Sequence, residues 1–136
     1  MLATDNQLSR PAKPCRSPPK KMTSTIEMSN SADNCGVVAS DLIFADCIAE
    51  GVYFETARLM RILFSHCDMY WASFLMAQLE NVTFDHCDLR GCDFTEAILT
   101  NCRFLHCDVG TDSVGGETTF DGVDLSTVEF LDCRGR

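Results

Sequence analysis

Apolar residues recur at every fifth position along most of the chain. Counting from Phe44, fourteen consecutive steps of five fall on apolar residues, and Phe alternates with a smaller side chain. A helix repeats about every 3.6 residues and a strand about every two, so neither element explains this spacing. The series consists of Phe44, Ala49, Phe54, Leu59, Phe64, Met69, Phe74, Leu79, Phe84, Leu89, Phe94, Leu99, Phe104 and Val109.

A second series lies two residues before the first, and a longer period is superimposed on both. Every member of the second series, from Leu42 to Cys107, is small or apolar. Cysteine returns every twenty residues at positions 47, 67, 87 and 107, and histidine does so at 66, 86 and 106. Four pentads therefore make one turn of a structure that stacks on itself, as internal repeats of fixed period do.

The individual pentads indicate the kind of stack. Segments such as "ARLMR", "AQLEN", "CDLRG", "CDFTE" and "AILTN" begin with a small residue and carry Leu or Phe in the third place. This pattern resembles the pentapeptide-repeat family over about 42–109, reaches back to Val37–Ala39, and resumes at 118–135. The resemblance implies an all-β, right-handed quadrilateral β-helix of about five coils. In such a solenoid the small residue and the Phe or Leu point inward, and the other three point outward.

The period breaks once, near the C-terminal end of the repeats. Beyond Val109 the steps of five resume at Phe120 in a displaced register. Six extra residues at 112–117 restore both periods, because Cys133 then rejoins the cysteine series. The sequence therefore predicts a Gly-rich loop that projects from one face. Its residues are Asp112, Ser113, Val114, Gly115, Gly116 and Glu117.

Composition divides the chain into two parts. Residues 1–36 hold five Lys or Arg, three acids and all four prolines, whereas residues 37–136 hold six arginines, no lysine and seventeen acids. A basic segment rich in Ser and Pro buries too little apolar surface to order itself. We therefore expect a disordered basic tail over 1–36 and the β-helix with its inserted loop over 37–136.

The same composition bears on the cellular compartment. No run of about 18–20 apolar residues is long enough to cross a bilayer, and the N-terminus lacks the compact apolar segment of a secretory signal. Nine cysteines without such a signal favour free thiols in a reducing compartment. A bacterial cytoplasmic location is expected, and export as an effector stays open because the tail would suit an export signal.

Three triplets, in "FSHCDM", "FDHCDL" and "FLHCDV", look like metal ligands or a thiol active site. In the expected β-helix each cysteine points inward as a small apolar residue, while its histidine and aspartate point outward. One triplet cannot bring its thiol and its imidazole to the same atom, so we expect no catalytic residue and no cofactor. The metal alternative left open is an ion shared along the outward ladder of His66, His86 and His106.

Two outward surfaces are candidates for binding. The first is an acidic wall, which would attract basic grooves as DNA phosphates do, although the repeat motif itself favours Asp. Its residues are Asp68, Asp88, Asp108, Asp93 and Asp85. The second is an aromatic and apolar cluster around "DMYWASFLM", which is typical of a protein-contact patch. Its residues are Tyr70, Trp71, Leu75, Met76, Tyr53 and Ile48.

Together these features favour a non-enzymatic protein-binding or scaffold module, since a convex wall offers no sheltered pocket for catalysis. Two alternatives stay open. One is a DNA-mimicking regulator of DNA gyrase or topoisomerase, which the family resemblance implies, and the other is a secreted effector or secretion-associated accessory protein. The expected partner is a protein of unknown identity, with no direct nucleic-acid binding and no membrane. Exposed apolar cross-sections at the solenoid ends would allow a homodimer.

Overall fold

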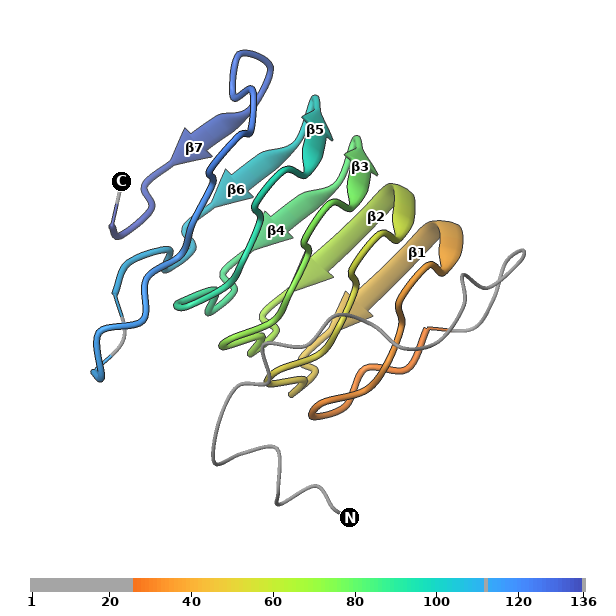
Figure 1. Ribbon diagram of the computed structural model, residues 1–136, viewed down its shortest axis with the longest axis horizontal. Coiled ribbons are helices and arrows are strands. Elements are labelled where there is room, and N and C mark those ends of the chain that lie inside the picture. Colours follow the sequence, from red (N-terminus) through yellow and green to blue (C-terminus); the bar gives the residue numbers. More distant parts are fainter. Residues whose placement is uncertain (1–25, 112, 136) are drawn as a thin grey trace.

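Parallel β-strands stacked in one direction form the described structure (Figure 1). The computed structural model describes residues 26–111 and 113–135. Within these residues there are seven strands and no helix, and hence no helix able to cross a membrane. The strands are β1 (Val38–Ala45), β2 (Arg58–Ser65), β3 (Gln78–Glu80), β4 (Thr83–Asp85), β5 (Ile98–Thr100), β6 (Arg103–Leu105) and β7 (Glu129–Leu131).

Strand pairing follows the twenty-residue period. Phe44 of β1 pairs with Phe64 of β2, and Phe84 of β4 pairs with Phe104 of β6. The last step is longer, because Phe104 pairs with Phe130 twenty-six positions later, after the six additional residues. The expected all-β solenoid of parallel coils is thereby confirmed.

Four faces surround the core, and we number them by the central residue of one coil. Face 1 is centred on Leu79, face 2 on Phe84, face 3 on Leu89 and face 4 on Phe94. Strands form faces 1 and 2, where β2 turns the corner and pairs with β3 on one face and β4 on the other. Faces 3 and 4 are held by single parallel bridges between successive coils.

Two stacks of phenylalanine rings fill the core. On face 2 the ring centroid of Phe84 lies 5.0 Å from those of Phe64 and Phe104. On face 4 the Phe74 and Phe94 centroids are 4.9 Å apart. The two stacks meet edge to face, as in the Phe84–Phe94 pair at 6.1 Å, an arrangement that aromatic quadrupoles favour. All five rings are fully buried, so they exclude water from the centre of the solenoid.

Corner residues take a left-handed backbone conformation at intervals of five. His86 and Asn81, which end successive faces, both have φ of 55°. At the corner after face 4, Glu96 has φ of 59° and the N–H of Ala97 donates to the carbonyl of Phe94 at 3.0 Å, which defines a type II turn. A non-glycine residue in this region is disfavoured by roughly 1–2 kcal/mol. The stacked core must offset this strain at each corner.

The solenoid begins earlier than composition predicts. Residues 26–36 belong to its first coil and do not form a disordered tail, since Asp33 forms a parallel bridge with Tyr53 of the next coil. The expectation for this stretch is therefore corrected. It failed because the polar, small-residue composition of 26–36 hides residues that occupy solenoid positions. The rest of the predicted tail, 1–25, lies outside the described residues.

Asn34 covers part of the first coil. It stands on face 4 where the later coils carry phenylalanine. The N–H of Glu27 donates to its side-chain oxygen at 3.0 Å, and its side-chain NH₂ donates to the carbonyl of Glu27 at 2.9 Å. Ile26 is buried beside this pair. A backbone segment is thus fixed across the start of the face 4 stack.

The terminal coils are incomplete, so the solenoid has about three full turns, slightly fewer than the five coils expected. Among the described strands, β1 pairs only with β2, and β7 pairs only with β6. Leu42 and Phe44 are consequently not fully buried, although the sequence periods predict inward positions for both. At the other end Phe130 is also half-buried.

Replacement of one ring should test how far stability depends on the stack. We expect Phe84→Ala to lower the free energy of unfolding by about 3–5 kcal/mol, because it leaves a cavity between two stacked rings. Phe130→Ala is the matched control, since it removes the same side chain from the half-buried end of the same stack and should cost clearly less. Denaturant unfolding measures both, and equal losses would contradict a core organised by the internal stack.

Candidate functional site

The cysteine and the histidine of each triplet point to opposite sides of the wall. Cys67, Cys87 and Cys107 are buried, whereas His86 is exposed. The Cys87 thiol donates to the carbonyl of Phe64 in the preceding coil at 3.2 Å. The predicted separation is confirmed. The thiol also does more than fill space, because it gives a weak hydrogen bond to the coil below it.

Seven of the described cysteines are free thiols, as expected from the sequence. Cys35 is different, because it forms a disulfide. The expectation of free thiols is therefore corrected for this residue, which the repeat pattern does not distinguish from its neighbours.

Three imidazole rings stack along the corner between faces 2 and 3. The centroids of His66 and His86 lie 4.7 Å apart, and those of His86 and His106 lie 4.8 Å apart, so the predicted ladder is confirmed. Nδ1 of His86 lies 2.7 Å from the Asp85 carboxylate, and Nδ1 of His106 lies 3.8 Å from that of Asp132. Carboxylates therefore flank the inner nitrogens of two rings.

The stacking itself disfavours a metal shared by two of these rings. The lone pair of an imidazole nitrogen lies in the ring plane, and the planes of His66 and His86 differ by only 6°. Equivalent nitrogens thus point the same way from about one coil spacing apart, more than twice a zinc–nitrogen bond of about 2.0–2.1 Å. Within residues 26–111 and 113–135, no group of three or more His, Cys, Asp or Glu is arranged to hold a metal ion.

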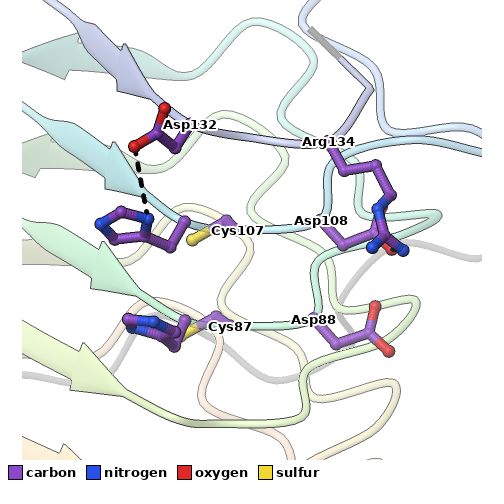
Figure 2. Close-up of a pocket in the computed structure, with 8 residues that line it drawn as sticks. Cys87, Asp88, Cys107, Asp108, Asp132 and Arg134 are labelled. Carbon is purple, nitrogen blue, oxygen red and sulfur yellow. Dashed lines mark ion pairs between the residues drawn. The ribbon is translucent and has the colours of Figure 1, made fainter.

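A hollow of about 350 Å³ runs along face 3 beside the ladder. Figure 2 shows Asp132 on one side, Asp88, Asp108 and Arg134 on the other, and Cys87 and Cys107 between them. His86 and His106 also line it. The hollow is a shallow trough between two outward columns of side chains, and it is open to solvent.

The aspartate column on face 3 is built into the wall. In three successive coils an Asp carboxylate accepts a hydrogen bond from the backbone N–H two residues later, as Asp88 does from Arg90 at 3.1 Å. Asp68 and Asp108 make the same bond at 3.2 and 3.1 Å. Such Asx-type bonds stabilise turns locally. The recurrence of Asp therefore has a structural cause that requires no target.

Arginines partly neutralise this column. Arg90 forms two hydrogen bonds to the Asp88 carboxylate, at 2.9 and 2.7 Å, and lies 3.8 Å from Asp108. Arg134 lies 3.7 Å from Asp108 on its other side. The hydrogen bond to Asp88 raises the pKa of Arg90. Neither arginine was expected at this site from the sequence, although the register that aligns Cys133 with Cys107 also places Arg134 beside Asp108.

The other acids of the expected wall are also engaged. Asp85 contacts the ring of His86. Asp93 accepts hydrogen bonds from the N–H of Thr95 at 2.9 Å and the hydroxyl of Thr119 at 3.2 Å. At the start of the column, burial and then a hydrogen bond with Asp68 raise the pKa of Glu50. The wall is acidic, but the carboxylates of the expected site are held by specific neighbours.

Trp71 lies at the corner between faces 3 and 4, against a glycine of the next coil. A Cβ at Gly91 would overlap the indole atoms Cδ1 and Nε1, so only glycine leaves room for the ring there. The Tyr70 ring lies 5.9 Å from the indole at an angle of 27°, and the Arg90 guanidinium lies 5.5 Å from the Tyr70 centroid. Trp71, Tyr70 and Arg90 thus form a packed, half-buried group, which we call the aromatic corner.

The remaining residues of the predicted cluster are spread around it. Ile48 is 64% exposed on face 3 of the preceding coil. Tyr53 and Leu75 are half-buried on face 4. Met76 is 55% exposed, but it lies one corner further round the coil. The structure therefore brings Tyr70 and Trp71 together, and it distributes the other four over two faces and a second corner.

The inserted loop leaves the solenoid at the same corner. Thr111 occupies the corner position one coil after Gly91 and two after Trp71. Thr111 and Glu117 form an antiparallel bridge at the base of the loop, and Val114 at its tip is 75% exposed. Asp112 lies outside the described residues. The spacing of twenty residues already aligns the loop with Trp71, although in the sequence the loop and the aromatic cluster look like separate features.

A family model matches the repeats of this chain. The family model described as the pentapeptide repeat region matches residues 39–113. A solved structure of a pentapeptide repeat protein from the thylakoid lumen of Arabidopsis thaliana is similar, with 24% sequence identity and a TM-score of 0.45. The alignment covers 79% of this chain and 67% of that one. Comparison with curated proteins finds no match.

A glycine substitution should test the packing of the aromatic corner. We expect Gly91→Ala to displace the indole of Trp71 and shift its fluorescence, because the added Cβ needs the space of the ring. Gly51→Ala is the matched control on the same corner column. Its φ of 69° is close to the 74° of Gly91, but its Cβ would meet only Ser31 Oγ, at 3.5 Å. A similar fluorescence change in both variants would contradict the packing described.

Zinc should not stabilise the protein. The parallel imidazoles cannot share an ion without leaving their stack, so we expect no rise in melting temperature when zinc is added. The measurement is a thermal melt with and without the metal. A clear rise that disappears when His66, His86 and His106 are all changed to Ala would show that the ladder binds metal.

Proposed function

Because this chain belongs to the pentapeptide-repeat family, we propose that it acts as a non-enzymatic protein-binding module whose contact surface is the aromatic corner and the adjoining loop. The observation that carries the proposal is their common position. Trp71 and the loop base at Thr111 lie on one corner column, two coils apart. At about 4.8 Å per coil, a single partner segment can reach both.

The composition of this surface resembles that of binding hot spots. Trp, Tyr and Arg dominate such sites, and they contribute most where neighbours hold them in place. Here Tyr70 lies between Trp71 and Arg90, and the guanidinium of Arg90 is fixed by its paired hydrogen bonds to Asp88. A partner that binds this group would therefore lose little side-chain entropy in ordering it.

Exposed apolar side chains extend the surface in both directions. Val114 projects from the loop, and Ile48 lies on face 3 one coil before Tyr70. Burial of such side chains contributes about 25 cal/mol for each Å² removed from water. A partner that follows the corner from Ile48 to the loop tip would gain from both ends of the patch.

A binding role fits the wall better than catalysis does. Active sites need groups that converge in a sheltered cavity. The face 3 hollow is an open trough, and its carboxylates are engaged by backbone N–H groups and by arginines. The buried thiols beneath it point away from the outward histidines.

A DNA-mimicking regulator of gyrase is the second candidate. The supporting observation is the net charge of −9, together with the carboxylates of Asp68, Asp88 and Asp108, which repeat coil by coil along face 3. Arg90 and Arg134 weaken this support, because they neutralise the upper part of that column. A supercoiling assay discriminates the two roles, since only a DNA mimic would change gyrase activity in proportion to added protein.

The proposal is tested by capture of partners on the immobilised full chain. We expect Trp71→Ala and Val114→Ala to lose the same proteins from the captured set, because both side chains belong to one contact surface. Ile98→Ala is the matched control, since it removes a side chain that is 59% exposed on face 1. Partners that survive both changes, or that disappear equally with Ile98→Ala, would overturn this surface as the contact site.

A further inference from the structure

Five thiols share one internal corner of the solenoid and one set of contacts. From the second coil on, each sulfur contacts the carbonyl of a phenylalanine in the coil before, at 3.5 Å for Cys67 and 3.2 Å for Cys107. Each also contacts the carbonyl two residues earlier in its own coil, at 3.5 Å for Cys67 and 3.4 Å for Cys107. The members of this thiol column are Cys47, Cys67, Cys87, Cys107 and Cys133.

Because their contacts repeat, the sulfurs must repeat at the coil spacing. The neighbouring side chains on this corner give that spacing directly. The His86 and His106 rings, each adjacent to a cysteine of the column, are 4.8 Å apart, and the Phe84 and Phe104 rings are 5.0 Å apart. Successive thiols therefore lie about one coil spacing apart.

This distance matches two metal–thiolate bonds placed end to end. A zinc–thiolate bond is about 2.3 Å long, and bonds of that length on both sides of an ion place its two sulfurs about 4.6 Å apart. We propose that the thiol column binds monovalent copper, each ion held in linear two-coordination between the sulfurs of adjacent coils. Soft thiolate ligands select Cu(I) among the first-row metals.

Geometry separates this site from a zinc site. Structural zinc takes four converging ligands, and the described residues offer no group of even three. The histidine ladder has the same spacing, but its lone pairs lie in the ring planes and point across the stack. A thiolate sulfur is not limited in this way, because its lone pairs can be directed along the column. The same coil spacing thus excludes shared metal on the outside of the corner and permits it on the inside.

Binding exchanges protons for metal. Two thiols and one Cu⁺ give a bis-thiolate complex with a single negative charge and release two protons, without any change of oxidation state. Where one thiolate is shared between two successive copper ions, the net negative charge of the copper–thiolate column is smaller, and less charge is buried inside the solenoid.

The thiol column is most accessible at its two ends. Cys47 in the first coil of the column and Cys133 in the last are only half-buried. Cys87 and Cys107 border the face 3 hollow, as Figure 2 shows, but both are buried. Metal can therefore reach the terminal thiols without unfolding of the solenoid. The thiol column does not involve the aromatic corner, so the copper proposal does not depend on the proposed protein-binding function.

The test is an anaerobic titration of the full chain with Cu(I), supplied as its acetonitrile complex against a Cu(I)-chelating dye. We expect uptake with the ultraviolet absorption of thiolate-to-copper charge transfer. Changing Cys67 and Cys107 to Ala together should abolish uptake, because the three remaining thiols of the column then have no neighbour on an adjacent coil. Alanine already fills equivalent inward positions, as at Ala77.

The matched control changes Cys92 and Cys102 to Ala together. These two thiols are as deeply buried and donate to carbonyls of the preceding coil at 3.1 and 3.4 Å, but neither has a cysteine above or below it. Uptake should therefore survive in the control. No uptake by the unmodified chain, or equal loss in the two double variants, would overturn the proposal.

X-ray absorption on the unmodified chain tests the same proposal without any substitution that might disturb folding. Linear coordination predicts two sulfur neighbours and no nitrogen around each copper ion. A nitrogen ligand or a higher coordination number would show that the histidines or the exposed surface bind the metal instead.

Discussion

Parallel hydrogen bonding between successive coils sets one distance for the whole molecule. Each backbone bridge, such as Asp68 to Asp88 and Phe84 to Phe104, repeats an identical step, so whatever a residue type does in one coil it does again about 4.8 Å further on. The phenylalanine stacks, the imidazole ladder, the aspartate column and the thiol column are four results of that single constraint. These four columns differ chemically in whether two copies of the same side chain, placed one coil apart, attract or repel each other.

Aromatic rings and thiols can repeat at the coil spacing without repulsion, whereas carboxylates require neighbouring positive charges or hydrogen-bond donors. Like charges one coil apart repel. Arg90 lies between Asp88 and Asp108, Arg134 lies on the other side of Asp108, and a backbone N–H donates to each carboxylate, so the repulsion is reduced. Arg90 also connects the acidic column to the aromatic corner, because it contacts both Asp88 and Tyr70. The acidic and aromatic surfaces, which sequence alone treats as separate, therefore share one residue.

The periods of five and twenty predicted the solenoid, the inward and outward assignment, the histidine ladder and the loop, because each depends only on position in the repeat. The features that these periods did not predict depend on contacts that long side chains make with neighbouring coils. The contact of Trp71 with Gly91 and the bridging by Arg90 cross between coils in ways that no spacing encodes. The start of the fold was also misplaced, since Asn34 replaces a ring of the stack with an amide, and hydropathy then gives no signal.

That amide has a further consequence for a molecule made of self-complementary layers. The end coil of a solenoid can pair with the end coil of another chain, and repeated pairing at an unprotected end would nucleate fibres. On face 4 the ring stack ends at Asn34, whose side chain is already bonded to the backbone of Glu27, with Ile26 buried alongside. An incoming chain finds no ring to continue and no free amide to pair with there. One polar substitution in the repeat thus removes, on face 4, the ring on which a further coil would stack.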